Sequence, residues 1–115
     1  MNKRMLGTDY ENKACEYLES EGYEILERNF RSKKGEIDII AKDGQYIVFV
    51  EVKYRYNNAF GYSVEAVDIR KQMIIYKVAE SYLNYTNNVA VPCRFDVIGF
   101  DDNKINHIKN AFGGI

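Results

Sequence analysis

The chain has 115 residues, of which 46% are hydrophobic and 29% charged, and its formal net charge is −1. This composition argues against disorder, and the length suits one domain over residues 1–115 with residues 1–6 flexible. The near-neutral net charge does not indicate a nucleic-acid-binding protein, but it does not exclude a local basic patch. No apolar run approaches the roughly 20 residues that cross a bilayer, and the N-terminus lacks the apolar stretch of a signal peptide. We therefore expect a cytoplasmic protein that is not associated with a membrane.

The first predicted element is a helix from Thr8 to Glu21, in which apolar side chains recur at helical spacing and Gly22 marks the end. Thr8 and Glu11 match a capping box, in which the Glu11 carboxylate would accept a hydrogen bond from the Thr8 backbone N–H. Glu11 therefore has an ordinary structural explanation, which we weigh equally with a role in a functional site.

Three strands are expected next, over residues 23–30, 36–41 and 46–55, with a turn at 32–35 between the first two. Asp43-Gly44 predicts a two-residue hairpin between the second and third. The third strand is apolar on both faces at its start and becomes polar on one face at its end, so we expect it to be a central strand that opens into a polar site.

Asp68 then predicts the N-cap of a long helix whose apolar stripe extends to Leu83. Two further strands are expected over residues 95–100 and 104–108. The order is α-β-β-β-α-β-β, which predicts an α/β fold with one mixed sheet and helices packed against it.

Three acidic side chains and one lysine are expected on one face of two neighbouring strands. Side chains alternate along a strand, so Glu36 shares a face with Asp38, and Glu51 shares a face with Lys53. Isolated acidic residues on strands are usually solvated, but this combination beside apolar neighbours favours a functional site.

A two-residue turn at Asp43-Gly44 would pair Lys42 with Gln45 and set the register of the hairpin. In that register Glu36 lies opposite Glu51, and Asp38 lies diagonal to Glu51, with Cβ atoms up to about 7–8 Å apart. A divalent ion could join two such carboxylates. A slip of one residue would place them on opposite faces and remove the site.

The sequence contains one histidine, His107, and two distant cysteines, Cys15 and Cys93. These residues are too few for a zinc site of ordinary spacing, so oxygen ligands and Mg²⁺ or Mn²⁺ are favoured. The chemistry that suits them is metal-assisted hydrolysis of a phosphodiester, with Lys53 orienting the attacking water or stabilising the developing negative charge. We expect His107 to be structural, and the sequence does not decide the role of Asp96.

The motifs at 35–40 (GEIDII) and 48–55 (VFVEVKYR) resemble the bacterial YraN-like family, in which endonuclease activity is inferred from the site residues. The resemblance continues through the segments at 28–31, 65–67 and 94–97 and covers nearly the whole chain. That family is similar to archaeal Holliday-junction resolvases and to the restriction-endonuclease-like PD-(D/E)XK superfamily. Ile37 stands where the superfamily motif has proline.

The resemblance implies a restriction-endonuclease-like fold in which Asp38 and Glu51 bind the metal and Lys53 is the lysine of the motif. It also matches Glu11 to a helical acid that often completes the metal site. Because related resolvases work as homodimers, it implies a homodimer. The expected partner is DNA, in branched form or with single-stranded regions.

Basic residues on either side of the acidic strands are candidates for phosphate contacts, with tyrosines nearby for base stacking. They are Arg31, Lys33, Lys34, Arg55, Arg70 and Lys71. Scattered surface charge is the ordinary alternative. Two other functions stay open at this point: a nucleic-acid-binding module with a nuclease-like fold but no turnover, and an interaction protein whose acids form surface ion pairs.

Overall fold

The computed structural model describes residues 7–55, 67–88, 90–101 and 104–112, with Arg55 described for its backbone only. The expected flexibility of residues 1–6 and the resemblance at Glu65 and Ala66 lie outside the described residues. Among the described residues, no helix is both long enough and apolar enough to cross a membrane.

The described elements follow the predicted order. Helix α1 (Gly7–Ser20) precedes three strands, β1 (Glu24–Ser32), β2 (Gly35–Asp43) and β3 (Tyr46–Arg55); helix α2 (Ile69–Tyr85) then leads to β4 (Cys93–Asp101) and β5 (Lys104–Ile108). The prediction of an α/β fold with a mixed sheet flanked by helices is therefore confirmed, with element ends differing by at most two residues.

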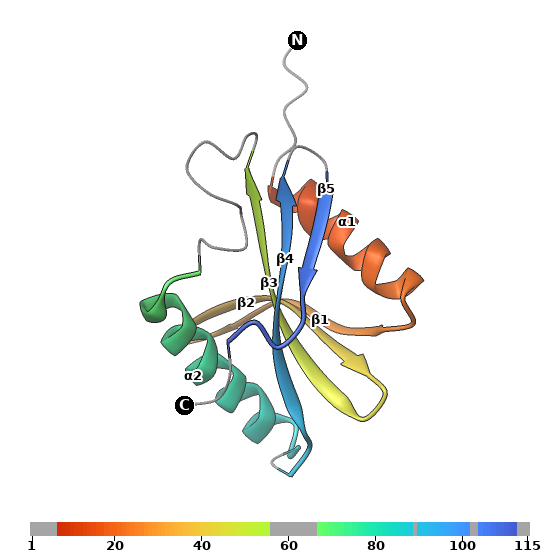
Figure 1. Ribbon diagram of the computed structural model, residues 1–115. Helices are drawn as coiled ribbons and strands as arrows, with labels where there is room; N and C mark the ends of the chain where they lie inside the picture. The colour runs from red at the N-terminus through yellow and green to blue at the C-terminus, as the bar shows by residue number, and fades with distance from the viewer. Residues whose placement is uncertain (1–6, 56–66, 89, 102–103, 113–115) are drawn as a thin grey trace.

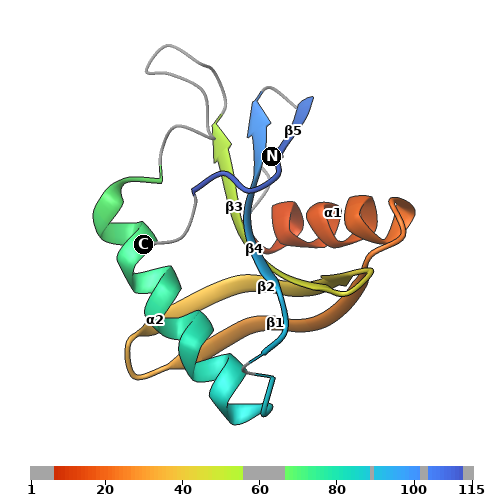
Figure 2. The same cartoon turned by 60° about the horizontal axis from the view of Figure 1, so that its bottom comes forward.

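The five strands form one sheet in the order β1-β2-β3-β4-β5, and only β3 and β4 are parallel. A parallel pair needs a long crossover, which contains α2. Figures 1 and 2 show α1 and α2 on opposite sides of the sheet, and β1 and β2 turning away from the other three strands.

Each helix buries its apolar stripe against a different face of the sheet. On the α1 face, Leu18 packs with the even-numbered residues Val48 and Val50 of β3; on the α2 face, Val78 packs with the odd-numbered Phe49. The start of β3 is thus buried on both faces, as predicted. Glu51 continues the odd-numbered row that faces α2.

The alternation of side chains is interrupted in β2 at Asp38. Ile37 and Ile40 both lie in the core on the α2 side, whereas Ile39 lies on the α1 side. The β1–β2 register places Asn29 opposite Asp38, and Asn29 has the left-handed φ of +52°. Asparagine is one of the few residues that adopts this conformation at low cost.

The turn between β1 and β2 is fixed to α2 by Gly35, which has φ +152°. A Cβ atom at this position would lie 2.5 Å from Cγ2 of Ile74, a β-branched side chain with little rotamer freedom. We expect Gly35→Ala to lower the free energy of unfolding by about 1–3 kcal/mol. Urea denaturation measures this change.

Gly44→Ala is the matched control, because Gly44 also has positive φ (+61°) but a Cβ atom there would meet nothing within 4 Å. It should cost only the backbone strain, about 1 kcal/mol. Equal losses in the two variants would contradict the close packing inferred for Gly35.

Candidate metal and nucleic-acid site

Glu51 is a buried acidic side chain between the sheet and α2, with an exposed fraction of only 4%. Its Oε2 atom lies 3.4 Å from Nζ of Lys53, two residues along β3, and 3.5 Å from Nζ of Lys71 in the first turn of α2. Burying a carboxylate is costly unless opposite charges or hydrogen bonds compensate. The two ammonium groups provide that compensation on one oxygen.

The other oxygen of Glu51 is not compensated. Oε1 is buried and has no hydrogen-bond partner among the described residues. A buried acceptor without a partner costs about 1–3 kcal/mol, so this atom is a ready ligand for a cation or a donor.

The turn that joins β2 to β3 differs from the prediction. Asp43 pairs with Tyr46, and the turn residues are Gly44 and Gln45, so the predicted Lys42–Gln45 pair is wrong. Gly44 has φ +61° at the first turn position, where a type II′ turn places glycine. The register is therefore shifted by two residues, which keeps the paired residues 39–43 and 46–50 on their predicted faces. The regular alternation assumed for Glu36 and Asp38 is wrong, because Ile37 and Ile39 lie on opposite faces of the sheet.

Extended by one residue beyond its last pair, this register places Asp38 opposite Glu51 rather than diagonal to it. The last ladder pair is Ile39 with Val50, and the next residues of the two strands are Asp38 and Glu51. The predicted pairings of Asp38 with Phe49 and of Glu36 with Glu51 are wrong, because Phe49 pairs with Ile40. The two side chains are close enough for the Glu51 charge and a side-chain hydrogen bond to raise the pKa of Asp38.

The position of Asp38 changes its acidity. Burial is the largest cause that raises the pKa of Asp38, and the negative charge of Glu51 is the second; a hydrogen bond from the Val52 N–H to Oδ2 (2.9 Å) lowers the pKa, and Glu11 makes a smaller upward contribution. Together these effects place the pKa of Asp38 at about 7. When protonated, Asp38 can donate a hydrogen bond to Glu51. Two facing carboxylates that compete for one proton also favour a divalent cation.

Glu11 approaches this pair from α1. Its Oε1 lies 3.9 Å from Nη2 of Arg28, and the Asn29 amide, oriented with its nitrogen toward the carboxylates, donates to Glu11 Oε1 at 3.2 Å and to Glu36 Oε2 at 2.8 Å. The helix begins at Gly7, so Thr8 is not its N-cap and the capping-box interpretation is wrong. Glu11 is held toward β1, near enough to raise the pKa of Asp38.

The predicted basic residues fall into two groups. Arg70 and Lys71 lie in the first turn of α2, where the Asp68 side chain caps the helix through the Lys71 N–H at 2.9 Å. Arg31, Lys33 and Lys34 are exposed at the β1–β2 turn, where Arg31 pairs with Glu36 at 3.5 Å. They line a surface hollow of about 330 Å³. The Arg55 side chain lies outside the described residues.

The carboxylates of Asp38 and Glu51 suit an ion such as Mg²⁺ or Mn²⁺, which keeps several of its waters, and not a metal that is enclosed by protein ligands alone. No group of three or more His, Cys, Asp or Glu side chains suited to one ion occurs among the described residues. Mg²⁺ is commonly bound through one or two carboxylates and keeps several waters. Asp38 and Glu51, with the unpartnered Oε1 atom, meet that smaller requirement.

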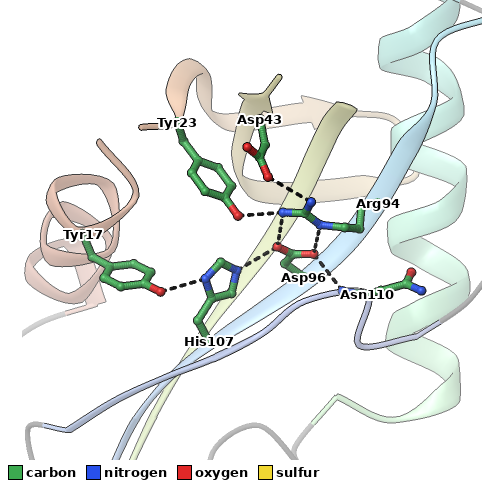
Figure 3. Close-up of polar contacts among 7 residues, drawn as sticks. All are labelled: Tyr17, Tyr23, Asp43, Arg94, Asp96, His107 and Asn110. Carbon is green, nitrogen blue, oxygen red and sulfur yellow. Dashed lines mark hydrogen bonds and ion pairs between the residues drawn. The ribbon is translucent and has the colours of Figure 1, made fainter. Parts of the chain in front are cut away.

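A second buried acid, Asp96, belongs to a polar network on the other face of the sheet (Figure 3). Asp96 is fully buried on β4 and accepts hydrogen bonds from Arg94 at 3.0 Å and from the Asn110 N–H at 3.0 Å, and it lies 2.7 Å from Nε2 of His107. Burial alone would raise the pKa of Asp96, but the hydrogen bonds from His107, Arg94 and Asn110 outweigh burial and lower it.

The network is closed by side chains from α1 and the turn regions. Tyr17 OH lies 2.9 Å from Nδ1 of His107, Tyr23 OH accepts from Arg94 at 2.7 Å, and Asp43 accepts from Arg94 at 3.0 Å. The expectation that His107 is structural is therefore confirmed. Sequence reasoning missed the network, and the available signal was the opposite charges of Arg94 and Asp96, two residues apart in β4 and therefore on one face of the strand.

Comparison with known proteins places the chain in a family. The model described as "Uncharacterised protein family UPF0102" matches residues 10–100. The chain belongs to this family. The YraN-like resemblance is thereby confirmed at the level of family membership.

Several bacterial UPF0102 proteins are similar over almost their full length. One from Fusobacterium nucleatum is 46% identical over 114 residues, covering 99% of this chain and 96% of its own. One from Lachnoclostridium phytofermentans is 47% identical over 114 residues, covering 97% and 96%. One from Caldicellulosiruptor saccharolyticus is 50% identical over 118 residues, covering 97% and 100%.

The raised pKa of Asp38 predicts how stability depends on pH. An unfolded aspartate ionises near pH 4, whereas folded Asp38 keeps its proton to about pH 7, so the free energy of unfolding falls as pH rises through that window. Relative to Asp38→Asn, the wild type should lose about 2–4 kcal/mol between pH 4 and pH 8. Urea denaturation in EDTA measures the difference.

Exposed Glu80 on α2 provides the control for this experiment, because Glu80→Gln removes a carboxylate that is not enclosed. Its stability should follow the wild-type pH profile. A profile of Asp38→Asn parallel to the wild type across the same range would refute the raised pKa.

The Asp96 network makes a separate prediction. Arg94→Met leaves the buried Asp96 charge without its guanidinium and should lower the free energy of unfolding by about 3–5 kcal/mol. Adding Asp96→Asn removes the stranded charge, so the double variant should be more stable than the sum of the two single losses implies. Purely additive losses, measured by thermal or urea denaturation, would contradict the charge pairing.

Proposed function

We propose that this UPF0102 protein is a metal-dependent nuclease that hydrolyses phosphodiester bonds in DNA. The observation that carries the proposal is the facing pair of Asp38 and Glu51, in which one oxygen of Glu51 is buried without a partner while the other faces two ammonium groups. Fixed carboxylates beside positive charge suit the stabilisation of a phosphoryl group during hydrolysis.

Asp38 and Glu51 would hold Mg²⁺ or Mn²⁺ between β2 and β3. The bound ion would supply Lewis-acid polarisation of the phosphoryl oxygen and a lower pKa for a water. Because Asp38 must lose its proton to act as a ligand, metal affinity should decrease below about pH 7. Glu11, held by Arg28 and Asn29, would add negative charge beside the pair.

Lys53 would act on the reacting groups. Its ammonium group is partly exposed beside Glu51, so it is placed to orient the attacking water or to stabilise the extra charge on phosphorus. In the reaction, the water oxygen bonds to phosphorus, the bond from phosphorus to the leaving sugar oxygen breaks, and that oxygen takes up a proton.

DNA would lie over the side of the sheet that carries α2. The β1–β2 turn packs against α2 at Ile74, so its exposed cations, Arg31, Lys33 and Lys34, and the basic first turn of the helix lie on connected elements. Both groups would contact phosphates, together with Arg55 as the sequence predicts. Branched DNA, or DNA with single-stranded regions, and a homodimeric state are the further parts of this proposal, which rest on the resemblance.

Tyr54 lies on the α1 face of the sheet, so it would contact a nucleobase only where the DNA passes around the end of β3. It follows Lys53 on β3, its side chain is 41% exposed, and its ring stacks on that of buried Tyr10 with a centroid distance of 4.3 Å. A ring supported on one face in this way is suited to stacking with an unpaired base.

The direct test is cleavage of supercoiled plasmid and of a labelled four-way junction with Mg²⁺ or Mn²⁺. We expect cleavage by the wild type that EDTA abolishes and that Lys53→Ala reduces by roughly 10²–10⁴-fold. Lys13→Ala, which removes an exposed charge on α1, is the matched control and should cleave at the wild-type rate.

DNA binding measured in parallel separates the alternatives. Equal cleavage by wild type and Lys53→Ala would refute the assigned role of Lys53. Salt-sensitive binding without cleavage under either metal would instead support the nucleic-acid-binding module. Failure to bind both metal and DNA would leave an interaction protein whose acids form ion pairs.

A further inference from the structure

Two lysines contact the same oxygen of Glu51, and they are held there in different ways. Lys53 belongs to β3, whereas Lys71 belongs to the first turn of α2, a separate element. We propose that Lys71 is a displaceable internal cation, which neutralises Glu51 in the metal-free protein and moves to a DNA phosphate when a metal ion binds. This inference rests on the proposed function.

The position of Lys71 on its helix makes Glu51 its main source of stabilisation. Lys71 is the third residue after the Asp68 N-cap, and the first turn contains no acidic residue but does contain a second cation, Arg70. The positive end of the helix dipole disfavours cations at this end. The ammonium group of Lys71 is therefore stabilised by Glu51 against repulsion from its own helix, whereas Asp68 accepts a hydrogen bond from the Lys71 backbone N–H.

A metal ion between Asp38 and Glu51 would reverse this balance. Glu51 has one free buried oxygen, so the ion would bind at the carboxylate that Lys71 already contacts through Oε2 at 3.5 Å. Two additional positive charges within a few ångströms repel an ammonium group strongly in a partly buried site. The ion would then neutralise the negative charge of Glu51, which holds Lys71 in place in the metal-free protein.

Lys71 rather than Lys53 is the residue that would leave. The Lys71 side chain is 36% exposed at a helix terminus, and its long flexible stem can reach outward. Lys53 is 29% exposed and extends from a sheet strand that pairs with Gly99 of β4 at this position. Once released, Lys71 lies beside Arg70 at a helix start, where a phosphate is a favourable partner.

Metal and DNA would then bind cooperatively through this one side chain. Binding of the ion frees Lys71 for a phosphate, and by linkage a bound phosphate makes Glu51 more available to the ion. The same contact explains how the buried Glu51 carboxylate is tolerated without metal, because the Lys71 ammonium group partly neutralises its charge when no ion is bound.

The experiment measures Mn²⁺ binding by calorimetry without DNA, and binding of a labelled DNA fork by fluorescence anisotropy with and without Ca²⁺. Lys71→Gln removes the competing charge and should bind Mn²⁺ about tenfold more tightly than the wild type. Lys71→Arg keeps the charge and should bind Mn²⁺ like the wild type. Lys77→Gln, an exposed lysine of the same helix, is the matched control and should stay within twofold.

The same substitution should weaken cooperativity with DNA. In the wild type Ca²⁺ should strengthen fork binding, and in Lys71→Gln that enhancement should shrink by about tenfold, with circular dichroism confirming that the variant is folded. Unchanged or weaker Mn²⁺ binding by folded Lys71→Gln overturns the inference while leaving the proposed metal site intact. No Mn²⁺ binding by the wild type overturns both, and tighter binding by Lys71→Gln without cleavage by any variant refutes only the nuclease.

Discussion

The negative charge of Glu51, enclosed between the sheet and α2, is the constraint on which the rest of the site depends. Glu51 continues a row of apolar side chains that contains Ile47 and Phe49. The alternation of side chains along β3 therefore places its carboxylate in the interior, although burial there is unfavourable for the charge. The neighbouring groups reduce the cost of this charge. Two ammonium groups contact one oxygen of Glu51, and the neighbouring acid Asp38 has a raised pKa. This imbalance of charge is the basis of the proposed cation site.

The two faces of the sheet treat a buried acid in opposite ways. Asp96, on the α1 side, has hydrogen-bond partners on both oxygens, drawn from β4, β5 and the backbone at Asn110. Glu51 has one oxygen with charged partners and one with none among the described residues. A fully satisfied network rigidifies the structure, whereas an incomplete one retains binding energy for a ligand. The contrast separates the structural acid from the candidate functional acid.

The element order and the shared face of Asp38 and Glu51 could be predicted from the sequence, because both depend on periodicities of two and 3.6 residues. The register was wrong by two residues, since the Asp43-Gly44 signal does not say which two residues occupy the turn; Gly44 takes the first position and Gln45 the second. Asp38 and Glu51 still share a face, because a register shift of an even number of residues leaves each side chain on the same side of the sheet. An odd error would have separated the acids.

Other features depend on contacts that no local pattern contains. The Thr8–Glu11 spacing matches a capping box, but the tertiary partners Arg28 and Asn29 determine where the Glu11 carboxylate lies. The network around Asp96 joins Tyr17 to His107 across 90 positions of sequence. Long-range hydrogen bonds of this kind are satisfied only when the whole chain is assembled, so single-residue preferences cannot reveal them.

The left-handed backbone at Asn29 limits which amino acids evolution can place there. Glycine would keep the bend in β1 but lose the amide that joins Glu11 to Glu36. Aspartate would keep the conformation but add a further negative charge beside Glu11 and Glu36. A β-branched residue would straighten the strand and withdraw Glu11 from Asp38. Asparagine meets the conformational and the electrostatic demands together, so an exposed residue of β1 links the shape of the strand to the position of the Glu11 carboxylate.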